Sequence, residues 1–215
     1  MELAEILSRV VDGLEDPSYS EETDIMPLVN EFVTETSRLY RLPDLQARGT
    51  LSIAEGDISV EMPDNFHKDV YRIYNSSLLK AVNLRSNLMA LEELYSGWEN
   101  QGSIKDVAII GSTMWVKPVP ISDQELDIFY YREPVLYEYD DEESELDGIP
   151  DDLCHVAVDY VLSKLYPKIE SGLEGRKPNT MFYKEELAMG MQKILFACKG
   201  APKPKPIVKR TARFF

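Results

Sequence analysis

The 215-residue chain is poor in the side chains that build metal centres and disulfide frameworks. It holds two cysteines, Cys154 and Cys198, and two histidines, His67 and His155. Both cysteines fall in helical patterns, so we expect reduced core residues in a reducing compartment. Two histidines are too few for a histidine-based site. We therefore expect no bound metal.

Long apolar runs and catalytic motifs are missing as well. No apolar run approaches 18 residues, so we expect no membrane partner. The patterns GxxxxGKS/T, GxGxxG, HExxH and GxSxG do not occur. Cys154 and His155 are adjacent, but neighbours on a helix point about 100° apart and do not face each other. We expect no catalytic residue, no cofactor and no enzyme, while a hydrolase with an unrecognised site stays an alternative.

Positive charge is absent from one stretch of the chain. Nine acidic residues lie between Glu138 and Asp152 without a single Lys or Arg. The spacing lacks the alternating ligands and central glycine of an EF-hand, so it predicts a solvated loop rather than a calcium site. The hypothesis for this loop is an acidic interface that receives the basic arm of a neighbour, formed by Asp140, Asp141, Glu142, Glu143 and Glu145.

Positive charge gathers instead at the end of the chain. Residues 1–186 hold all 38 acidic residues, whereas residues 187–215 hold seven Lys and Arg and no acid. Residues 1–186 are so acidic that this part of the chain should bind DNA phosphates poorly. Three prolines favour an extended arm that loses little entropy on binding. We predict a docking arm that uses Lys203, Lys205, Ile207, Val208, Lys209, Arg210, Arg213, Phe214 and Phe215. A disordered tail is the alternative.

Hydrophobic periodicity divides the rest of the chain into helical ends and a β-rich middle. Helical spacing runs from Leu3 to Leu14, from Ile25 to Tyr40, from Leu153 to Leu165 and from about Asn179 to Lys199. In the last of these helices we expect five residues to point inward: Leu187, Met191, Ile194, Leu195 and Cys198.

Strand-like alternation occupies the middle of the chain, with a hairpin turn expected at Gly111 and Ser112. We expect an α+β protein: a bundle of about four helices with an inserted antiparallel, β-rich, sandwich-like domain and an extended C-terminal arm. The predicted boundaries are 1–46 and 147–199 for the two halves of the bundle, 47–146 for the insertion and 200–215 for the arm.

The order of these motifs resembles the head-to-tail adaptor (connector or neck) proteins of tailed bacteriophages and gene transfer agents. A Gly-Trp pair follows a short helix, a hairpin leads to a strand ending in Pro118 and Pro120, and "LDIFYYREP" precedes the acidic linker. The helix "IPDDLCHVAVDYVLSKLY" is entered through Ile-Pro. In the front half, Met62, Pro63, Asp64 and Phe66 match a strand–Pro–Asp–Phe–strand step. The resemblance covers roughly residues 5–198.

The resemblance implies a structural virion protein of the neck, between capsid and tail, made in the host cytoplasm. Such proteins form a homo-oligomeric ring, usually a dodecamer, beneath the portal protein, and present a surface to the next tail or neck protein. DNA passes through the ring without sequence-specific binding, and acidic, repulsive walls suit that passage. The C-terminal arm commonly docks on the portal. A monomeric, soluble, phage-encoded binding module with no virion role is the alternative.

Overall fold

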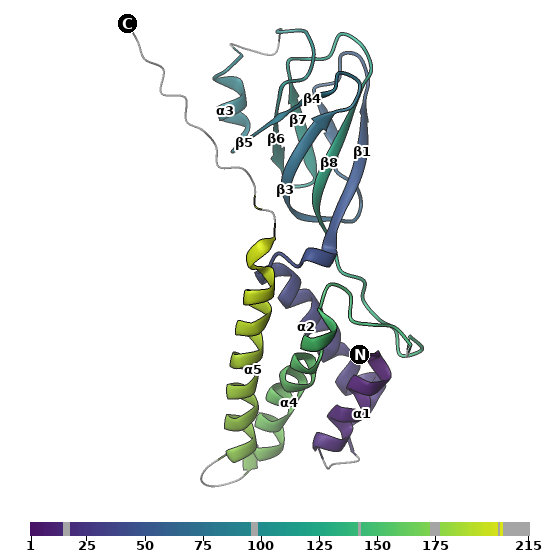
Figure 1. The fold of residues 1–215 in the computed structure, drawn as a ribbon, viewed down its shortest axis with the longest axis vertical. Helices are drawn as coiled ribbons and strands as arrows, with labels where there is room; N and C mark the ends of the chain where they lie inside the picture. The colour runs from purple at the N-terminus through teal and green to yellow at the C-terminus, as the bar shows by residue number, and fades with distance from the viewer. Residues whose placement is uncertain (15–17, 96–98, 142, 173–176, 202, 204–215) are drawn as a thin grey trace, which may run out of the picture. The chain divides into compact units, whose positions relative to one another are not determined.

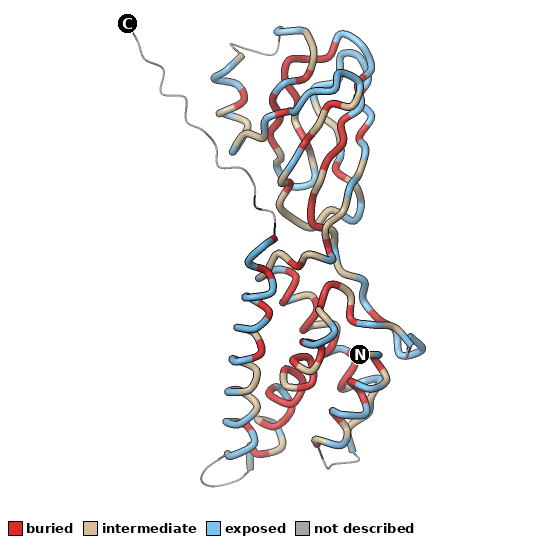
Figure 2. Tube along the Cα trace, in the orientation of Figure 1, coloured by how far each residue is buried: buried red, intermediate tan, exposed pale blue. Residues whose placement is uncertain are grey.

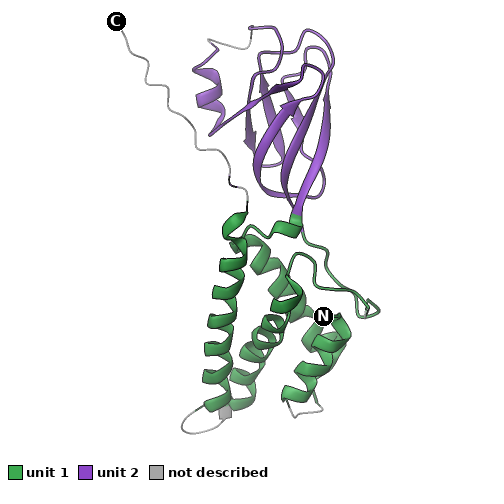
Figure 3. Ribbon diagram, viewed as in Figure 1, with its two compact units in different colours: residues 1–45, 134–201 green, residues 46–133, 202–215 purple. Residues whose placement is uncertain are grey.

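The computed structural model describes residues 1–215 except 15–17, 96–98, 142, 173–176, 202 and 204–215. The chain forms two compact units (Figures 1 and 3). The helical unit contains residues 1–45 and 134–201, and residues 46–133 form the inserted unit. The chain thus leaves the helical unit once and returns to it once.

The helical unit is built around one central helix. Its helices are α1 (Leu3–Leu14), α2 (Met26–Leu39), α4 (His155–Ile169) and α5 (Pro178–Ala197). Shorter turns are η1 (Glu21–Ile25), η2 (Pro43–Leu45), η3 (Asp151–Leu153), η4 (Glu170–Gly172) and η5 (Cys198–Gly200). Helices α1, α2 and α5 each pack against α4. Accordingly, α4 is buried along most of its length while α5 is exposed along one side (Figure 2).

Most residues of the apolar stripes predicted for the first three long helices are buried in the helical unit, whereas Val11, Leu28 and Tyr40 are partly buried. On α1, Leu3, Ile6, Leu7, Val10 and Leu14 are buried. The stripe of α4 continues through the turn η3, and its members are all buried: Leu153, Val156, Ala157, Tyr160, Val161 and Leu165. No helix among the described residues is long and apolar enough to cross a membrane.

A carboxylate from the preceding turn caps the start of α5. Glu170, buried in η4, accepts hydrogen bonds from the backbone nitrogens of Asn179 (3.2 Å) and Thr180 (3.1 Å) and from the Thr180 hydroxyl (2.6 Å). The first N–H groups of a helix have no partner inside the helix and attract negative charge. Glu170 therefore fixes where α5 begins relative to the end of α4.

The inserted unit is a sandwich of two four-stranded sheets. The strands are β1 (Gln46–Ile53), β2 (Ser59–Glu61), β3 (Phe66–Asn75), β4 (Lys80–Ala81), β5 (Asn83–Arg85), β6 (Asp106–Ile110), β7 (Thr113–Lys117) and β8 (Gln124–Arg132), with helix α3 (Leu88–Glu92) between β5 and β6. One sheet has the order β1-β8-β3-β4 and the other β2-β7-β6-β5. The pair β5–β6 is parallel and the remaining pairs are antiparallel.

The core of the inserted unit lies between the two sheets. Leu126, Ile128 and Tyr130 alternate inward along β8 and pack in one cluster with Met114 and Val116 of β7. The hairpin expected at Gly111 is present, and its φ of +62° is the backbone geometry that glycine adopts without strain. The predicted α+β class is therefore confirmed, with more strands than the sequence pattern revealed.

Two segments differ from the sequence expectations. Residues 134–146, placed by their sequence in the β-rich insertion, belong to the compact helical unit, because Tyr137 and Leu146 are buried there. Ile194 on α5 and Cys198 in the following turn η5 are buried as expected, and Leu187 and Met191 are partly buried, but Leu195 is 48% exposed. The expectation for Leu195 was wrong because the contact with α4 covers a narrower face of α5 than its apolar residues occupy.

Candidate interaction site at the acidic segment

The acidic segment, residues 134–148, connects β8 to η3, and its described residues form no helix or strand. Near its start, at Tyr137, it is fixed to α2 by a reciprocal pair of hydrogen bonds. The Asn30 amide Nδ2 donates to the backbone oxygen of Tyr137 (2.9 Å), and the Tyr137 backbone nitrogen donates to Asn30 Oδ1 (2.9 Å). A backbone that leaves regular structure needs such partners wherever it is buried.

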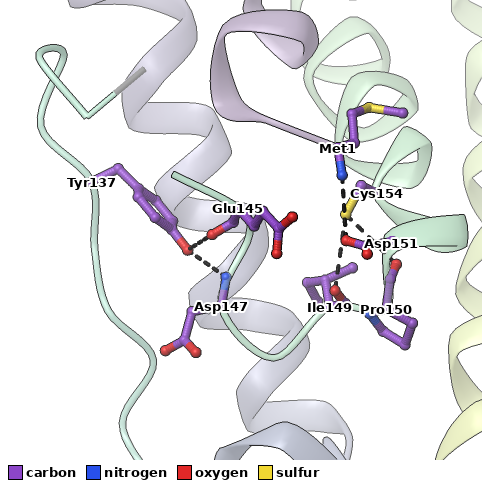
Figure 4. A network of polar contacts seen from close by, with 8 residues as sticks. All are labelled: Met1, Tyr137, Glu145, Asp147, Ile149, Pro150, Asp151 and Cys154. Carbon is purple, nitrogen blue, oxygen red and sulfur yellow. Dashed lines mark hydrogen bonds and ion pairs between the residues drawn. The ribbon is translucent and has the colours of Figure 1, made fainter. Parts of the chain in front are cut away.

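The Tyr137 ring ties the two arms of the acidic segment together. Its hydroxyl donates to the backbone oxygen of Glu145 (2.9 Å) and accepts a hydrogen bond from the backbone nitrogen of Asp147 (Figure 4). The Asp147 carboxylate in turn accepts from the backbone nitrogen of Val135 (2.8 Å). The segment is therefore a closed loop with a defined base.

The start of the chain flanks the same loop. The backbone nitrogen of Leu3 donates to the Ser144 oxygen (2.8 Å), and Glu2 forms an isolated β-bridge with Glu145. The amino group of Met1 lies 3.3 Å from the Asp151 carboxylate (Figure 4). These contacts hold the loop against α1 as well as α2.

The acidic residues of the loop divide into structural and free carboxylates. Asp141 closes a turn, because its carboxylate accepts from the Glu138 nitrogen (2.9 Å) and its backbone nitrogen donates to the Glu138 oxygen (3.1 Å). Asp140, Glu143 and Glu145 are exposed side chains. The remaining predicted member, Glu142, lies outside the described residues.

A cleft of about 620 Å³ opens between α2 and this loop. It combines three carboxylates with apolar and aromatic surface: its lining residues are Glu22, Met26, Pro27, Asn30, Tyr137, Glu138, Tyr139 and Asp140. The sequence places no Lys or Arg between Arg132 and Lys164, so the loop supplies no cation of its own. Such a surface suits a partner with basic and apolar side chains.

The predicted docking arm falls almost entirely outside the described residues. Lys203 is described and exposed. The other eight predicted arm residues, Lys205, Ile207, Val208, Lys209, Arg210, Arg213, Phe214 and Phe215, lie outside the described part, so their role stays a prediction.

The adjacent Cys154 and His155 do not form a nucleophile and base. Cys154 is fully buried, with its sulfur 3.6 Å from the Pro150 backbone oxygen and 3.9 Å from that of Ile149 (Figure 4). Burial raises the pKa of the Cys154 thiol to about 11, so the sulfur is protonated and unreactive at neutral pH. The described residues contain no group of three or more His, Cys, Asp or Glu that could hold a metal ion.

Sequence reasoning missed the residues that shape this site. Asn30 and Tyr137 are 107 positions apart, and no local pattern joins them. The exposed apolar residues Val135, Leu136 and Tyr139 were missed too, although a signal was present: large apolar residues stand directly before a run of acids, where a purely solvated loop would have polar ones.

The comparison with protein families gives one match. A family described as SU10 adaptor protein matches residues 1–196, which includes both units and the long helices of the helical unit. No curated protein matches the chain.

Proposed function

Because the chain belongs to the SU10 adaptor protein family, a family of phage head-tail adaptors, we propose that it forms a ring beneath the portal of a tailed phage. In that position it extends the DNA channel and offers a surface to the next neck or tail protein. The observation that carries the proposal is the family match from residue 1 to residue 196, across the helices, the inserted sandwich and the return to the helices.

The organisation of the helical unit supports a structural role. Several of its described polar side chains fix backbone groups, as Asn30, Tyr137 and Glu170 do, and both of its thiols are buried. Its surface includes an acidic loop and exposed apolar residues on α5, among them Phe182, Met189 and Phe196, and both suit protein partners. The proposed partners are therefore the portal protein, tail or neck proteins and further copies of the chain, in a ring that we expect to be dodecameric.

We assign the contact with the portal to the C-terminal arm. Helix α5 ends in the turn η5, and the residues that follow combine prolines, five cations and four large apolar side chains. Prolines restrict the unbound arm and so reduce the entropy lost on docking, while Phe214 and Phe215 offer the aromatic groups that carry much of the energy of protein interfaces. The arm would anchor each copy to the portal.

The acidic body suits a channel through which DNA moves. All 38 acidic residues precede residue 187, so a lumen lined by this part of the chain repels phosphate and does not hold the moving DNA. A ring structure in which the lumen is lined mainly by Lys and Arg would contradict this part of the proposal.

The test is binding of the purified protein to its cognate portal ring. We compare the full chain with one that ends at Gly200 and with a full-length control in which residues 204–215 are replaced by Gly and Ser. Cosedimentation measures binding, and electron microscopy of the complex counts the copies. The proposal predicts a twelve-fold ring for the full chain and loss of binding for both altered chains while their circular dichroism is unchanged. Equal binding by all three would remove the arm from the portal contact, and no binding by any would overturn the adaptor role.

A further inference from the structure

The outward side of α5 is apolar where a solvent-facing helix is expected to be polar. Phe182, Met189 and Phe196 are 54%, 49% and 59% exposed, and Met181 and Leu195 are exposed beside them. We name these five residues the α5 outer face. Single exposed apolar residues are ordinary, but an exposed row along one helix marks a surface for a partner.

The spacing of this row is that of helix packing. Phe182, Met189 and Phe196 follow one another at intervals of seven residues. Met181 and Leu195 are fourteen residues apart, with the exposed Ala188 halfway between them. Seven residues make nearly two helical turns, so the side chains stand in line over the 20 residues of α5. The opposite side of the helix, with Gly190 and Ile194, already packs within its own unit.

The helical unit has a second exposed apolar patch, on the acidic segment. Val135 and Leu136 are 56% and 57% exposed, and Tyr139 is exposed beside them. They are surrounded by the acidic side chains of Glu138 and Asp140. We name Val135, Leu136, Tyr139 and the described acids Glu138, Asp140, Asp141, Glu143 and Glu145 the acidic apolar edge. The hydrogen bonds of Tyr137 and Asp147 keep its backbone in place.

The two patches are complementary in charge. The last acidic residue of the chain is Glu186, so the second half of the α5 outer face is accompanied by Lys193 and Lys199 alone. The ammonium of Lys199 lies 3.6 Å from the centre of the Phe196 ring, which places positive charge on the apolar surface itself. In the acidic apolar edge, Glu138 and Asp140 are the sequence neighbours of Tyr139.

The two patches lie on opposite sides of the helical unit. In Figure 1, α5 stands at one side of α4, and the acidic segment projects at the other side, beyond α2 and α1. Complementary patches on segments that lie at opposite sides of the unit do not meet within one copy. They can meet between two copies, in a head-to-tail contact. Repeated contacts of this kind close into a ring when the rotation from one copy to the next divides a full turn evenly.

Building on the ring of the proposed function, we propose that the α5 outer face of one copy packs on the acidic apolar edge of the next copy around the ring. The five side chains of the face are each about half exposed. Even at the ~200 Å² that a fully buried aromatic side chain covers, they would offer at most roughly 500 Å². A standard stable interface buries about 800 Å² per partner. The contact is therefore weak for a single pair, and the portal is what brings the copies together.

Cysteine crosslinking of the full-length protein tests this contact and its direction. Two single variants are made, Met189→Cys on α5 and Leu136→Cys on the acidic apolar edge, and both native cysteines stay because they are buried. The variants are mixed, bound to the cognate portal and oxidised. Ser8→Cys, an exposed position on α1 outside both patches, replaces Leu136→Cys in the matched control.

The expected result is a disulfide dimer from Met189→Cys mixed with Leu136→Cys, at least tenfold above either variant alone and above the Ser8→Cys control. A chain with both substitutions gives a ladder of oligomers. Dimers of Met189→Cys with itself would overturn the proposal in favour of a symmetric α5 contact, and no crosslink on the portal would overturn it outright. If the unmodified protein does not bind the portal, the proposed function fails separately. Crosslinking in concentrated protein then decides: a mixed dimer supports the contact, and its absence refutes it.

Discussion

Replacing Gly190 by alanine is expected to separate α5 from α4 and to destabilise the helical unit. A methyl group at this position would lie 2.7 and 2.8 Å from the two Cγ atoms of Val156 and 3.2 Å from its Cβ. Both Cγ atoms branch from the same carbon, so no rotation of Val156 removes both contacts, and valine in a helix is largely restricted to one rotamer. The helices themselves must therefore shift.

Two opposing effects determine the magnitude. Alanine is favoured over glycine inside a helix by about 1 kcal/mol. Overpacking a well-packed contact costs about 1–3 kcal/mol. We therefore expect Gly190→Ala to lower the free energy of unfolding by about 1 kcal/mol. Val156→Ala alone should cost about 2 kcal/mol through lost burial and a small cavity. In the double variant the new methyl occupies the vacated space, so the combined cost should fall at least ~1 kcal/mol below the sum.

Urea unfolding measures these differences. Circular dichroism at 222 nm follows the helices, most of which belong to the helical unit, whereas both tryptophans lie within residues 46–133 and their fluorescence follows the inserted unit. Gly200→Ala is the matched control, because nothing lies within 4 Å of a methyl group there. If Gly190→Ala were as stable as the unmodified protein or more stable, the gain in helix propensity would equal or exceed the cost of overpacking. Helix α5 would then not approach α4 as closely as the structure places it.

Three further outcomes follow from the contacts of the helical unit. Tyr137→Phe removes the hydroxyl that joins Glu145 to Asp147 and should cost about 1–2 kcal/mol in urea unfolding; Tyr139→Phe, which removes a hydroxyl that donates to the Glu21 carboxylate (3.2 Å) at the surface, is the control, and equal costs would contradict the anchoring role. The hydrogen bond from the Thr180 side chain lowers the pKa of Glu170, so its stabilising effect is complete above the ordinary pKa of 4.5 and is lost as the pH falls through the folded-state pKa. Glu170→Gln should therefore melt at a lower temperature than the unmodified protein at pH 7, with the gap closing in acid; a gap independent of pH would refute the charge effect. In a Cys198→Ser background, Cys154 should resist iodoacetamide at pH 8 and react only after unfolding, because burial raises its pKa to about 11; rapid labelling of the folded protein would contradict its burial.

Elements set by neighbouring residues were predictable from the sequence. The alternation of Leu126, Ile128 and Tyr130 identified β8, and Gly111 identified the hairpin between β6 and β7. Each of these signals is local, because a turn needs a particular φ and a half-buried strand needs a period of two. Strand β1 was not predicted because two of its four inward positions are the small residues Ala47 and Gly49, which add little apolar signal to that of Leu51 and Ile53.

Features set by contacts between distant segments were not predictable. Leu195 was expected to point inward because α5 carries apolar residues on every side, and a period cannot select one face of such a helix. Gly190 determines which face of α5 packs on α4, because its missing side chain lets Val156 approach the helix there. Likewise, the acidic segment belongs to the helical unit through Asn30 and Tyr137, which only the folded chain brings together. The assignments to the arm beyond Lys203 stay predictions.

The strands that begin and end the inserted unit are direct neighbours, with Gln46 paired to Tyr131. Paired residues of antiparallel strands have Cα atoms about 5 Å apart. The two ends of the insertion are therefore as close together as the two ends of a short loop. The sandwich is therefore a cassette. Recombination between phage genomes can exchange it for another domain with adjacent ends while the helices keep their packing, and a protein engineer can excise it and close the gap with a turn of a few residues.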